Sequence, residues 1–310
     1  MNQPLNQLLN QPLPTNPPLT TTTWIGLIVL SVLWGGSFFF SAIALREFHP
    51  FTIVFGRVAV AAIALNAYIY LQGQQIPGHR WGEFLVMGAL NNLIRFCLIV
   101  WGQTHIHSSM ASILNATAPI FTVLLAHWFT RDERLTVNRL VGTLAGFGGV
   151  VVLVGADIGH GLSLENLGQV AVLGAALSYS LAGLYGRRFK GLAPAVSAAG
   201  MVTSTALMML PITVIVDHPW TANPTALTWG AVLALGLLCT AIAYLLYFHI
   251  LAMAGATNLL LVTFLIPTSA LLLGVGILGE RLEWNALVGM GLIFTGLGAI
   301  DGRIWLKKQS

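Results

Sequence analysis

Long apolar stretches separated by short polar gaps run along almost the whole chain. A helix needs about 20 residues to cross the roughly 30 Å hydrocarbon core of a bilayer. The stretches that qualify are residues 24–45, 50–71, 81–103, 110–130, 137–154, 166–187, 194–216, 226–252, 257–278 and 285–304. They lack the apolar–polar alternation of a transmembrane β-barrel, so helices are the remaining structure that can span a membrane. The pattern therefore predicts an all-α integral membrane protein with ten transmembrane helices.

The composition supports this prediction. Of the 310 residues, 56% are hydrophobic and only 8% are charged, whereas about 25% are charged in soluble domains. The basic residues are scattered over the gaps, so the net charge of +4 does not indicate nucleic-acid binding. Cys97 and Cys239 lie inside apolar stretches, where a free thiol acts as a small hydrophobic side chain. We expect no disulfide, no cofactor and no metal.

One part of the sequence is present twice. Residues 118–153 and 266–300 share the same order of features: a proline, then Glu-Arg-Leu in a polar gap, then Leu-Val-Gly and a glycine-rich stretch. The prolines, Pro119 and Pro267, are 148 residues apart, and the two Glu-Arg-Leu triplets are 147 residues apart. Such an ordered repeat indicates a tandem duplication, and its period sets the architecture.

The duplication divides the chain into two halves. We expect a first repeat at residues 24–155, a second repeat at residues 156–305 and a short C-terminal tail at residues 306–310. Residues 1–23 contain no Lys or Arg, so they lack the basic start of a secretory signal peptide. We expect them to form a disordered N-terminal tail.

Five helices per repeat is an odd number, so the second repeat should enter the membrane inverted. Inverted repeats are typical of secondary transporters, which expose a site near the midplane to each side in turn. Cytoplasmic loops carry an excess of Lys and Arg. With a cytoplasmic N-terminus, only Arg46 and Arg281 lie outside, against Arg80, Arg131, Arg134, Arg139, Arg187, Arg188, Lys190, Arg303, Lys307 and Lys308 inside. We therefore expect both termini in the cytoplasm.

Several motifs carry a resemblance to a known family. They are Trp34-Gly35-Gly36-Ser37-Phe38, Pro50 with Arg57, Pro119 followed by Glu133, and Pro267 followed by Gly279-Glu280. Over residues 24–305 the chain resembles the drug/metabolite transporter superfamily, specifically its ten-helix EamA-type exporters. Within these it is most similar to the YddG-type aromatic amino acid exporters. The resemblance implies a multi-pass protein that exports small metabolites across a bacterial inner membrane.

The acidic residues bear on ion coupling. All ten lie in gaps or close to a helix end: Glu47, Glu83, Asp132, Glu133, Asp157, Glu165, Asp217, Glu280, Glu283 and Asp301. Proton and sodium pumps usually keep an ionisable group inside the membrane. His127 and His249 remain there, but neutral packing hydrogen bonds would also explain them. We expect a facilitator that needs no proton gradient.

Two arginines, Arg57 and Arg95, lie within predicted helices and have no acidic partner nearby in sequence. A guanidinium matches a substrate carboxylate with two parallel hydrogen bonds. Alternatively, each arginine caps helix-end carbonyls or extends toward the interface. Both interpretations stay open, and Asn91 should share a helix face with Arg95.

Aromatic and polar residues recur at helical spacing on the presumed inner faces. An aromatic cavity with few charges suits a flat apolar substrate with a polar end, such as an aromatic amino acid. Tyr and Trp also gather at membrane interfaces, which is the alternative for Trp101 in particular. The predicted substrate-binding residues are Trp34, Ser37, Phe38, Asn91, Arg95, Trp101, Tyr179, Thr240, Tyr244 and Tyr247.

The remaining features concern mechanics and assembly. Pro119 and Pro267 should kink helices 4 and 9, either as hinges or as fixed bends. Helices 5 and 10 are rich in glycine, as at Gly142 and Gly146, which lets helix backbones approach closely. We expect helices 4, 5, 9 and 10 to form a scaffold away from the substrate, in a monomer or weak dimer.

Other classes of function are less well supported. No zinc-protease, serine-hydrolase or paired intramembrane aspartate motif is present, so we expect no enzyme. His105 and His107 alone are weak evidence for a metal. A channel would need a repeated polar ring around the bundle. An exporter of another metabolite or of a cationic drug, with or without proton coupling, is the alternative. The expected partners are a small-molecule substrate and the lipid bilayer, without nucleic acid.

Overall fold

The computed structural model describes residues 20–129, 136–158, 163–189, 191–259 and 261–301, except for the side chains of residues 155–158, 256–257 and 301. Within these ranges the chain forms helices and connecting turns, with no strand. Eight helical segments are long and apolar enough to cross a membrane, and two shorter apolar helices follow. The chain is thus an all-helical membrane protein, while the count of ten spanning helices stays a prediction.

Six of the ten segments are simple helices or a helix with a short 3₁₀ end. They are α2 (Thr21–Ala44), α3 (Pro50–Leu71), α8 (Val137–Ile158), α9 (Leu164–Tyr185) with the 3₁₀ turn η3 (Gly186–Phe189), α10 (Pro194–Val216) and α14 (Trp284–Asp301). A further 3₁₀ turn, η4 (Pro219–Thr221), follows α10. The start of α2 lies three residues before the predicted position, because the Thr20 side chain caps the helix by accepting from the backbone N–H of Thr23.

Two of the other four segments are composite. The third joins the 3₁₀ turn η1 (Gly78–Arg80) to α4 (Trp81–Gly88), the π-turn η2 (Ala89–Ile94) and α5 (Arg95–Gly102). The eighth joins α11 (Ala226–Gly236), the π-turn η5 (Leu237–Ile242) and α12 (Ala243–Leu259). The two π-turns begin 148 residues apart, which is the spacing of the duplicated prolines. The duplication is therefore visible in local backbone geometry as well as in sequence.

Helices 4 and 9 differ from each other. Predicted segment 110–130 is broken after Asn115 into α6 (Ser108–Asn115) and α7 (Ala118–Phe129), and Pro119 is the second residue of α7. Its counterpart α13 (Val262–Gly276) runs through Pro267 without a break. The chain bends before α13 instead, at Gly255 with φ of 76° inside α12.

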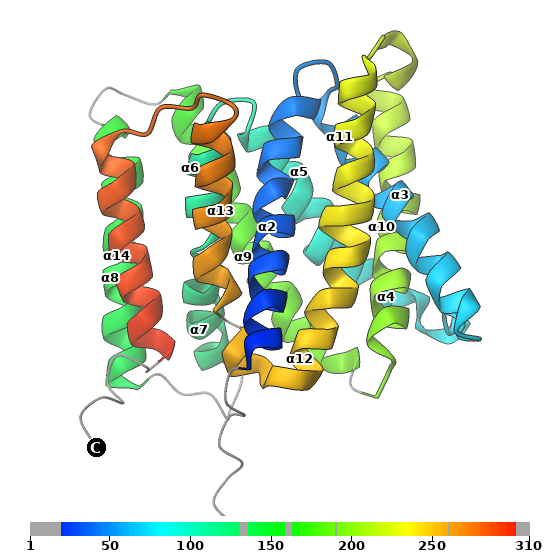
Figure 1. Cartoon of the computed structure of the whole chain (residues 1–310), viewed down its shortest axis with the longest axis horizontal. Helices are drawn as coiled ribbons and strands as arrows, with labels where there is room; N and C mark the ends of the chain where they lie inside the picture. Colours follow the sequence, from blue (N-terminus) through cyan, green and yellow to red (C-terminus); the bar gives the residue numbers. More distant parts are fainter. Residues whose placement is uncertain (1–19, 130–135, 159–162, 190, 260, 302–310) are drawn as a thin grey trace, which may run out of the picture.

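Hydrogen bonds between connecting loops show which helix ends lie together. At one end, a helix-start residue donates to a carboxylate from another loop in three pairs: Thr52 to Asp217, Thr225 to Glu47 and Ser108 to Glu280. We call this the distal end. The start of α2 and the end of α14 lie at the opposite end, which we call the terminal end (Figure 1).

The first helices of the two halves run in opposite directions. α2 begins at the terminal end, whereas α9 ends there, because Arg80 beyond α3 donates to the backbone oxygen of Arg188 at 2.8 Å. Two repeats that are inverted in the membrane require their first helices to run in opposite directions. Arg46 and Arg281 lie in loops at the distal end, whereas Arg80, Arg187 and Arg188 lie in the 3₁₀ turns η1 and η3 at the terminal end.

The α8–α14 pair shows the symmetry most directly. These helices lie side by side (Figure 1), and glycines let their backbones approach. A Cβ on Gly142 would lie 2.5 Å from the Gly296 oxygen, and a Cβ on Gly149 would lie 2.7 Å from the Gly289 oxygen. Gly289 and Gly296 each lie 147 residues after a glycine of the other helix, Gly142 and Gly149 respectively. The contact is thus nearly self-complementary, as an approximate two-fold axis requires.

Helices from the two halves alternate throughout the bundle. α2 packs on α12 and α13, α3 on α10, α5 and α7 on α9, and α8 on α14. The largest buried apolar cluster joins α3 of the first half to α10 and α11 of the second. The described chain therefore forms one bundle in which each half supports the other, with the central helices meeting along the seam.

We predict that Gly142→Ala destabilises the protein, because overpacking a close contact costs about 1–3 kcal/mol. Gly148→Ala on the same helix is the matched control, since a Cβ there meets no atom within 4 Å. Thermal unfolding of the purified proteins should show a clear loss for Gly142→Ala only. Equal midpoints for both variants would contradict the close α8–α14 contact.

Candidate functional site

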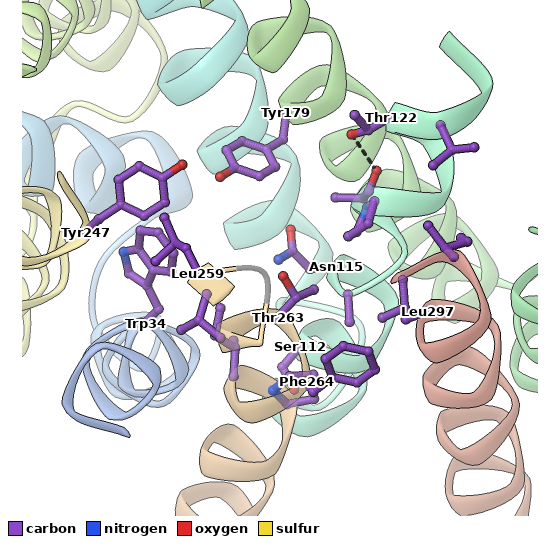
Figure 2. Close-up of a pocket in the computed structure, with 18 of the residues that line it drawn as sticks. Trp34, Ser112, Asn115, Thr122, Tyr179, Tyr247, Leu259, Thr263, Phe264 and Leu297 are labelled. Atoms are coloured by element: carbon purple, nitrogen blue, oxygen red, sulfur yellow. Dashed lines mark hydrogen bonds between the residues drawn. The ribbon is translucent and has the colours of Figure 1, made fainter. Parts of the chain in front are cut away.

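A cavity of about 440 Å³ lies between the two halves, within the usual size of small-molecule sites. Its lining comes from α2, α5, α6, α7, α8, α9, α12, α13 and α14 (Figure 2). The residues with polar or aromatic side chains are Trp34, Arg95, Ser112, Asn115, Thr122, Arg139, Tyr179, Tyr247, Thr263 and Phe264. The cavity is therefore built by both repeats.

The cavity reaches the terminal end of the molecule. Its lining includes Arg139 near the start of α8, Leu259 at the end of α12 and Ile300 near the end of α14. No described residue of the distal loops lines it. At its deep end lie Ser112 on α6 and Ile266 on α13. This arrangement gives a site accessible from one end of the bundle.

Aromatic rings form one wall. Trp34 and Tyr247 lie with ring centroids 5.4 Å apart, and Tyr179 faces them from α9 (Figure 2). Phe264 adds a ring from α13. The structure thus brings together three of the predicted site residues, Trp34, Tyr179 and Tyr247. Their faces can hold a flat apolar group.

Arg95 supplies positive charge to this wall. Its guanidinium carbon lies 4.1 Å from the centre of the Tyr179 ring. Its Nε is buried and has no hydrogen-bond partner among the described residues. Arg139 is the second cation in the lining, which contains no carboxylate among the described residues. The cavity is therefore suited to an anionic group.

Asn115 offers a hydrogen-bond acceptor, whereas Arg95 offers a donor. This residue ends α6 beside the break before α7, and its side chain faces the cavity (Figure 2). Its Oδ1 atom is buried without a hydrogen-bond donor among the described residues. An unsatisfied buried polar atom is costly and calls for an explanation. Together, Arg95 offers a free donor and Asn115 a free acceptor.

A small extension of about 30 Å³ continues past these two residues. Both Arg95 and Asn115 line it as well as the main cavity, together with the predicted Ser37, Phe38 and Tyr244. The volume is too small for a second substrate. It extends the polar end of the site into the bundle.

Arg57 also borders the extension, but its donors are occupied. Nε donates to Thr240 Oγ1 at 2.8 Å and Nη1 donates to Ser37 Oγ at 2.8 Å. Nη2 donates to the Cys239 backbone oxygen at 3.5 Å, and the guanidinium carbon lies 3.8 Å from the Phe96 ring centre. These contacts tie α3 to α2, α5 and η5, which favours a structural role for Arg57.

Asn91 and Thr240 lie inside the helix packing and do not line the cavity. Asn91 Nδ2 donates to the Tyr244 hydroxyl at 2.9 Å, and this hydroxyl donates to Asn92 Oδ1 at 2.9 Å. The prediction that Asn91 and Arg95 share a face assumed an α-helix. The π-turn η2 adds a residue to one turn and rotates Arg95 relative to Asn91.

Trp101 is not brought to the cavity. It lies at the end of α5 near the distal end, is 37% exposed and packs edge-on against His105 with ring centroids 4.8 Å apart. This position agrees with the alternative interpretation, an aromatic residue at the membrane interface. It removes Trp101 from the substrate-contacting set.

The expectation that helices 4 and 9 lie away from the substrate is wrong. Both line the cavity, through Asn115 and Pro119 on one side and Thr263 and Pro267 on the other. Asn115 and Thr263 occupy equivalent positions, 148 residues apart. Both of these equivalent residues line the cavity, so the two repeats contribute corresponding positions to it. Helices 5 and 10 form the expected close pair, but they also reach the cavity lining, through Arg139 on α8 and through Leu297 and Ile300 on α14.

No titratable acid borders the cavity among the described side chains. Glu47, Glu83, Glu165, Asp217, Glu280 and Glu283 all lie at helix ends or in loops. Asp132 and Glu133 lie outside the described residues, as do the side chains of Asp157 and Asp301. His127 and His249 are both exposed on the bundle surface and do not line the cavity.

The sequence matches a known protein family, and the fold matches a solved structure. A profile of the EamA-like transporter family matches residues 22–155 and again residues 166–300. A solved crystal structure superposes with a TM-score of 0.66 at 20% identity, covering 94% of this chain and 99% of its own, which shows a shared fold.

The chain also resembles curated transporters. The uncharacterized inner membrane transporter YedA of Escherichia coli strain K12 is 25% identical over 84% of this chain and 85% of its own. YoaV, an uncharacterized transporter of Bacillus subtilis, is 24% identical over 88% and 94%. A "Probable terminal-alkyne amino-acid exporter" of Streptantibioticus cattleyicolor is 28% identical over 94% and 97%.

The contacts of the two arginines predict different consequences of their removal. Arg57→Gln should lower the free energy of unfolding by about 2 kcal/mol, because it removes charged hydrogen bonds inside the bundle. Arg95→Gln should cost clearly less, since its Nε has no hydrogen bond to lose and only the contact with the Tyr179 ring is given up. Thermal unfolding of both variants in the same detergent tests this. If Arg95→Gln lost more stability than Arg57→Gln, Arg95 would be the structural arginine and Arg57 the one available to a substrate.

Proposed function

The chain belongs to the EamA-like transporter family, and on this basis we propose that it exports amino acids, preferring aromatic ones. One observation carries the substrate class: an unpartnered donor on Arg95 and an unpartnered acceptor on Asn115 lie in one aromatic-walled cavity. An amino acid presents the complementary pair of groups, a carboxylate and an ammonium, next to its side chain.

In the proposed complex, the carboxylate binds the Arg95 guanidinium, which can donate two parallel hydrogen bonds. The ammonium donates to Asn115 Oδ1. The aromatic side chain lies between Trp34, Tyr179 and Tyr247, whose rings provide apolar faces at little cost in side-chain entropy. The two polar contacts supply partners for Arg95 Nε and Asn115 Oδ1, which have none among the described residues.

Two kinds of likeness support this substrate class. One relative bears the name of an amino-acid exporter, as given above. The resemblance to YddG-type aromatic amino acid exporters that the sequence motifs suggest favours the same class. A cationic drug is the alternative substrate, but a cavity with two arginines and no carboxylate among its described lining residues disfavours a cation.

We place the protein in the bacterial inner membrane as two inverted five-helix repeats with cytoplasmic termini. Basic loops favour the cytoplasmic side, and the cavity then opens toward the cytoplasm, where an export substrate enters. Rocking of one half against the other would expose the site to the far side. Pro119 and Pro267, both at the cavity wall, are the proposed hinges. A monomer would suffice, since both halves of the site lie on one chain.

We predict that substrate analogues separate the two polar contacts. In proteoliposome counterflow of labelled tryptophan, tryptamine lacks the carboxylate and indole-3-propionate lacks the ammonium. Each should compete at least about tenfold more weakly than tryptophan, since an unpaired buried group costs about 1–3 kcal/mol. Arg95→Gln should abolish the penalty for tryptamine, and Asn115→Leu the penalty for indole-3-propionate.

Trp101→Ala is the control, because Trp101 lies outside the cavity. In this variant tryptamine and indole-3-propionate should both still compete more weakly than tryptophan. If Arg95→Gln weakens all three compounds equally, Arg95 does not read the carboxylate. Absence of any tryptophan counterflow by a folded preparation would move the substrate to another metabolite.

We further predict transport without ion coupling. Net tryptophan flux should follow the tryptophan gradient alone, because no described carboxylate borders the site. Flux measured in liposomes with equal pH on both sides, and then with an imposed pH gradient, should agree within about twofold. Strict dependence on the pH gradient would establish proton coupling instead.

A further inference from the structure

At the distal end, three carboxylates cross between the halves. Each accepts hydrogen bonds from a backbone N–H and a hydroxyl at the start of a helix in the other half. An acceptor at this position satisfies free N–H groups and favours the helix dipole. The three crossings are Glu47 to Thr225 before α11, Asp217 to Thr52 on α3, and Glu280 to Ser108 and Ser109 on α6.

Glu280 makes the most extensive of these contacts. One oxygen accepts from Ser108 N at 2.9 Å and from Ser108 Oγ at 2.6 Å. The other accepts from Ser109 N at 3.0 Å and from Ser109 Oγ. Burial alone would raise the pKa of Glu280, but these four hydrogen bonds hold it below its ordinary value. The carboxylate is thus ionised and fully engaged at neutral pH.

The backbone presents Glu280 in a fixed position. Its N–H donates to the Gly274 oxygen at 3.0 Å, and Gly279 before it has φ of 70°, which favours glycine. A Cβ on Gly274 would lie 2.5 Å from the Glu280 carboxylate and would also meet Ser109. The end of α13 therefore fits closely around the contact with α6.

Only the Glu280 contact joins two helices that line the main cavity. Ser112 and Asn115 of α6 follow Ser108 by about one and two turns, and α13 lines the cavity through Ile266 and Pro267. The other two crossings hold α3 and α11, which line no part of that cavity among the described residues. Parting α6 from α13 would open the closed end of the site.

We propose that Glu280 is the distal gate latch: its bonds to Ser108 and Ser109 hold the cavity closed at that end, and their release lets α6 part from α13. The Glu47 and Asp217 contacts are static ties. The inference rests on the alternating-access part of the proposed function. It does not depend on which metabolite is carried.

Distances across the distal end test the latch without any substrate. Spin labels on Thr104→Cys and Glu283→Cys, both exposed in distal loops, report the separation of the α5–α6 loop from the α13–α14 loop. Cys97 and Cys239 are replaced by alanine in the full-length protein. Pulsed electron-spin measurements in lipid nanodiscs then compare Glu280→Ala, Glu280→Gln and Asp217→Asn with the parent.

For Glu280→Ala, the ratio of long to short distances should rise at least about tenfold, equivalent to about 1.4 kcal/mol. Glu280→Gln keeps one carbonyl acceptor and should shift the ratio in the same direction but less. Asp217→Asn should stay within about twofold of the parent. If Glu280→Ala does not fold, Glu280→Gln alone decides.

A parental distance distribution in a folded Glu280 variant would overturn the proposal. An equal shift in Asp217→Asn would also overturn it, because breaking any of the three crossings would then open the distal end. Counterflow measured on the same samples distinguishes a failure of the latch from a failure of the proposed substrate. A shifted distribution without tryptophan exchange supports the latch and contradicts the substrate, whereas exchange with an unshifted distribution does the reverse.

Discussion

Polar groups inside a hydrocarbon layer need partners within the protein, and in this chain many of those partners come from the other half. Arg57 of the first half is held by Thr240 of the second, and Tyr244 of the second half is held by Asn91 and Asn92 of the first. Neither half could bury these groups alone. The requirement explains why the helices of the two repeats alternate and why the seam between them is the polar part of the bundle.

At the cavity, pairing across this seam is incomplete. Around it, arginine, asparagine and tyrosine side chains satisfy one another across the halves, whereas Arg95 Nε and Asn115 Oδ1 do not. The break between α6 and α7 leaves Asn115 at a helix end, where its amide faces the open space. A ligand that supplies the missing groups completes the same kind of network that holds the bundle together.

Sequence reasoning reached the general architecture and part of the site. Apolar stretch lengths located the eight long apolar segments and the two shorter apolar helices. Helical spacing selected Trp34, Tyr179 and Tyr247, which line the cavity, because these residues lie on regular α-helix. Sequence reasoning failed where the backbone departs from a regular α-helix. No residue pattern announced the π-turn that separates Asn91 from Arg95, or the break that turns Asn115 inward. The contact between Glu280 and Ser108 joins loops 172 residues apart, which local patterns cannot connect.

The paired π-turns bear on the ancestry of the protein. A π-turn arises when one extra residue enters a helical turn, which is costly to maintain without a benefit. Its presence at the same place in both halves, 148 residues apart, is most simply inherited from a single five-helix precursor that already contained it. Such a precursor had to associate with an oppositely oriented copy of itself to bury its polar seam. Joining two such copies in one chain makes that antiparallel pairing permanent and lets the copies differ, as α6–α7 and α13 do.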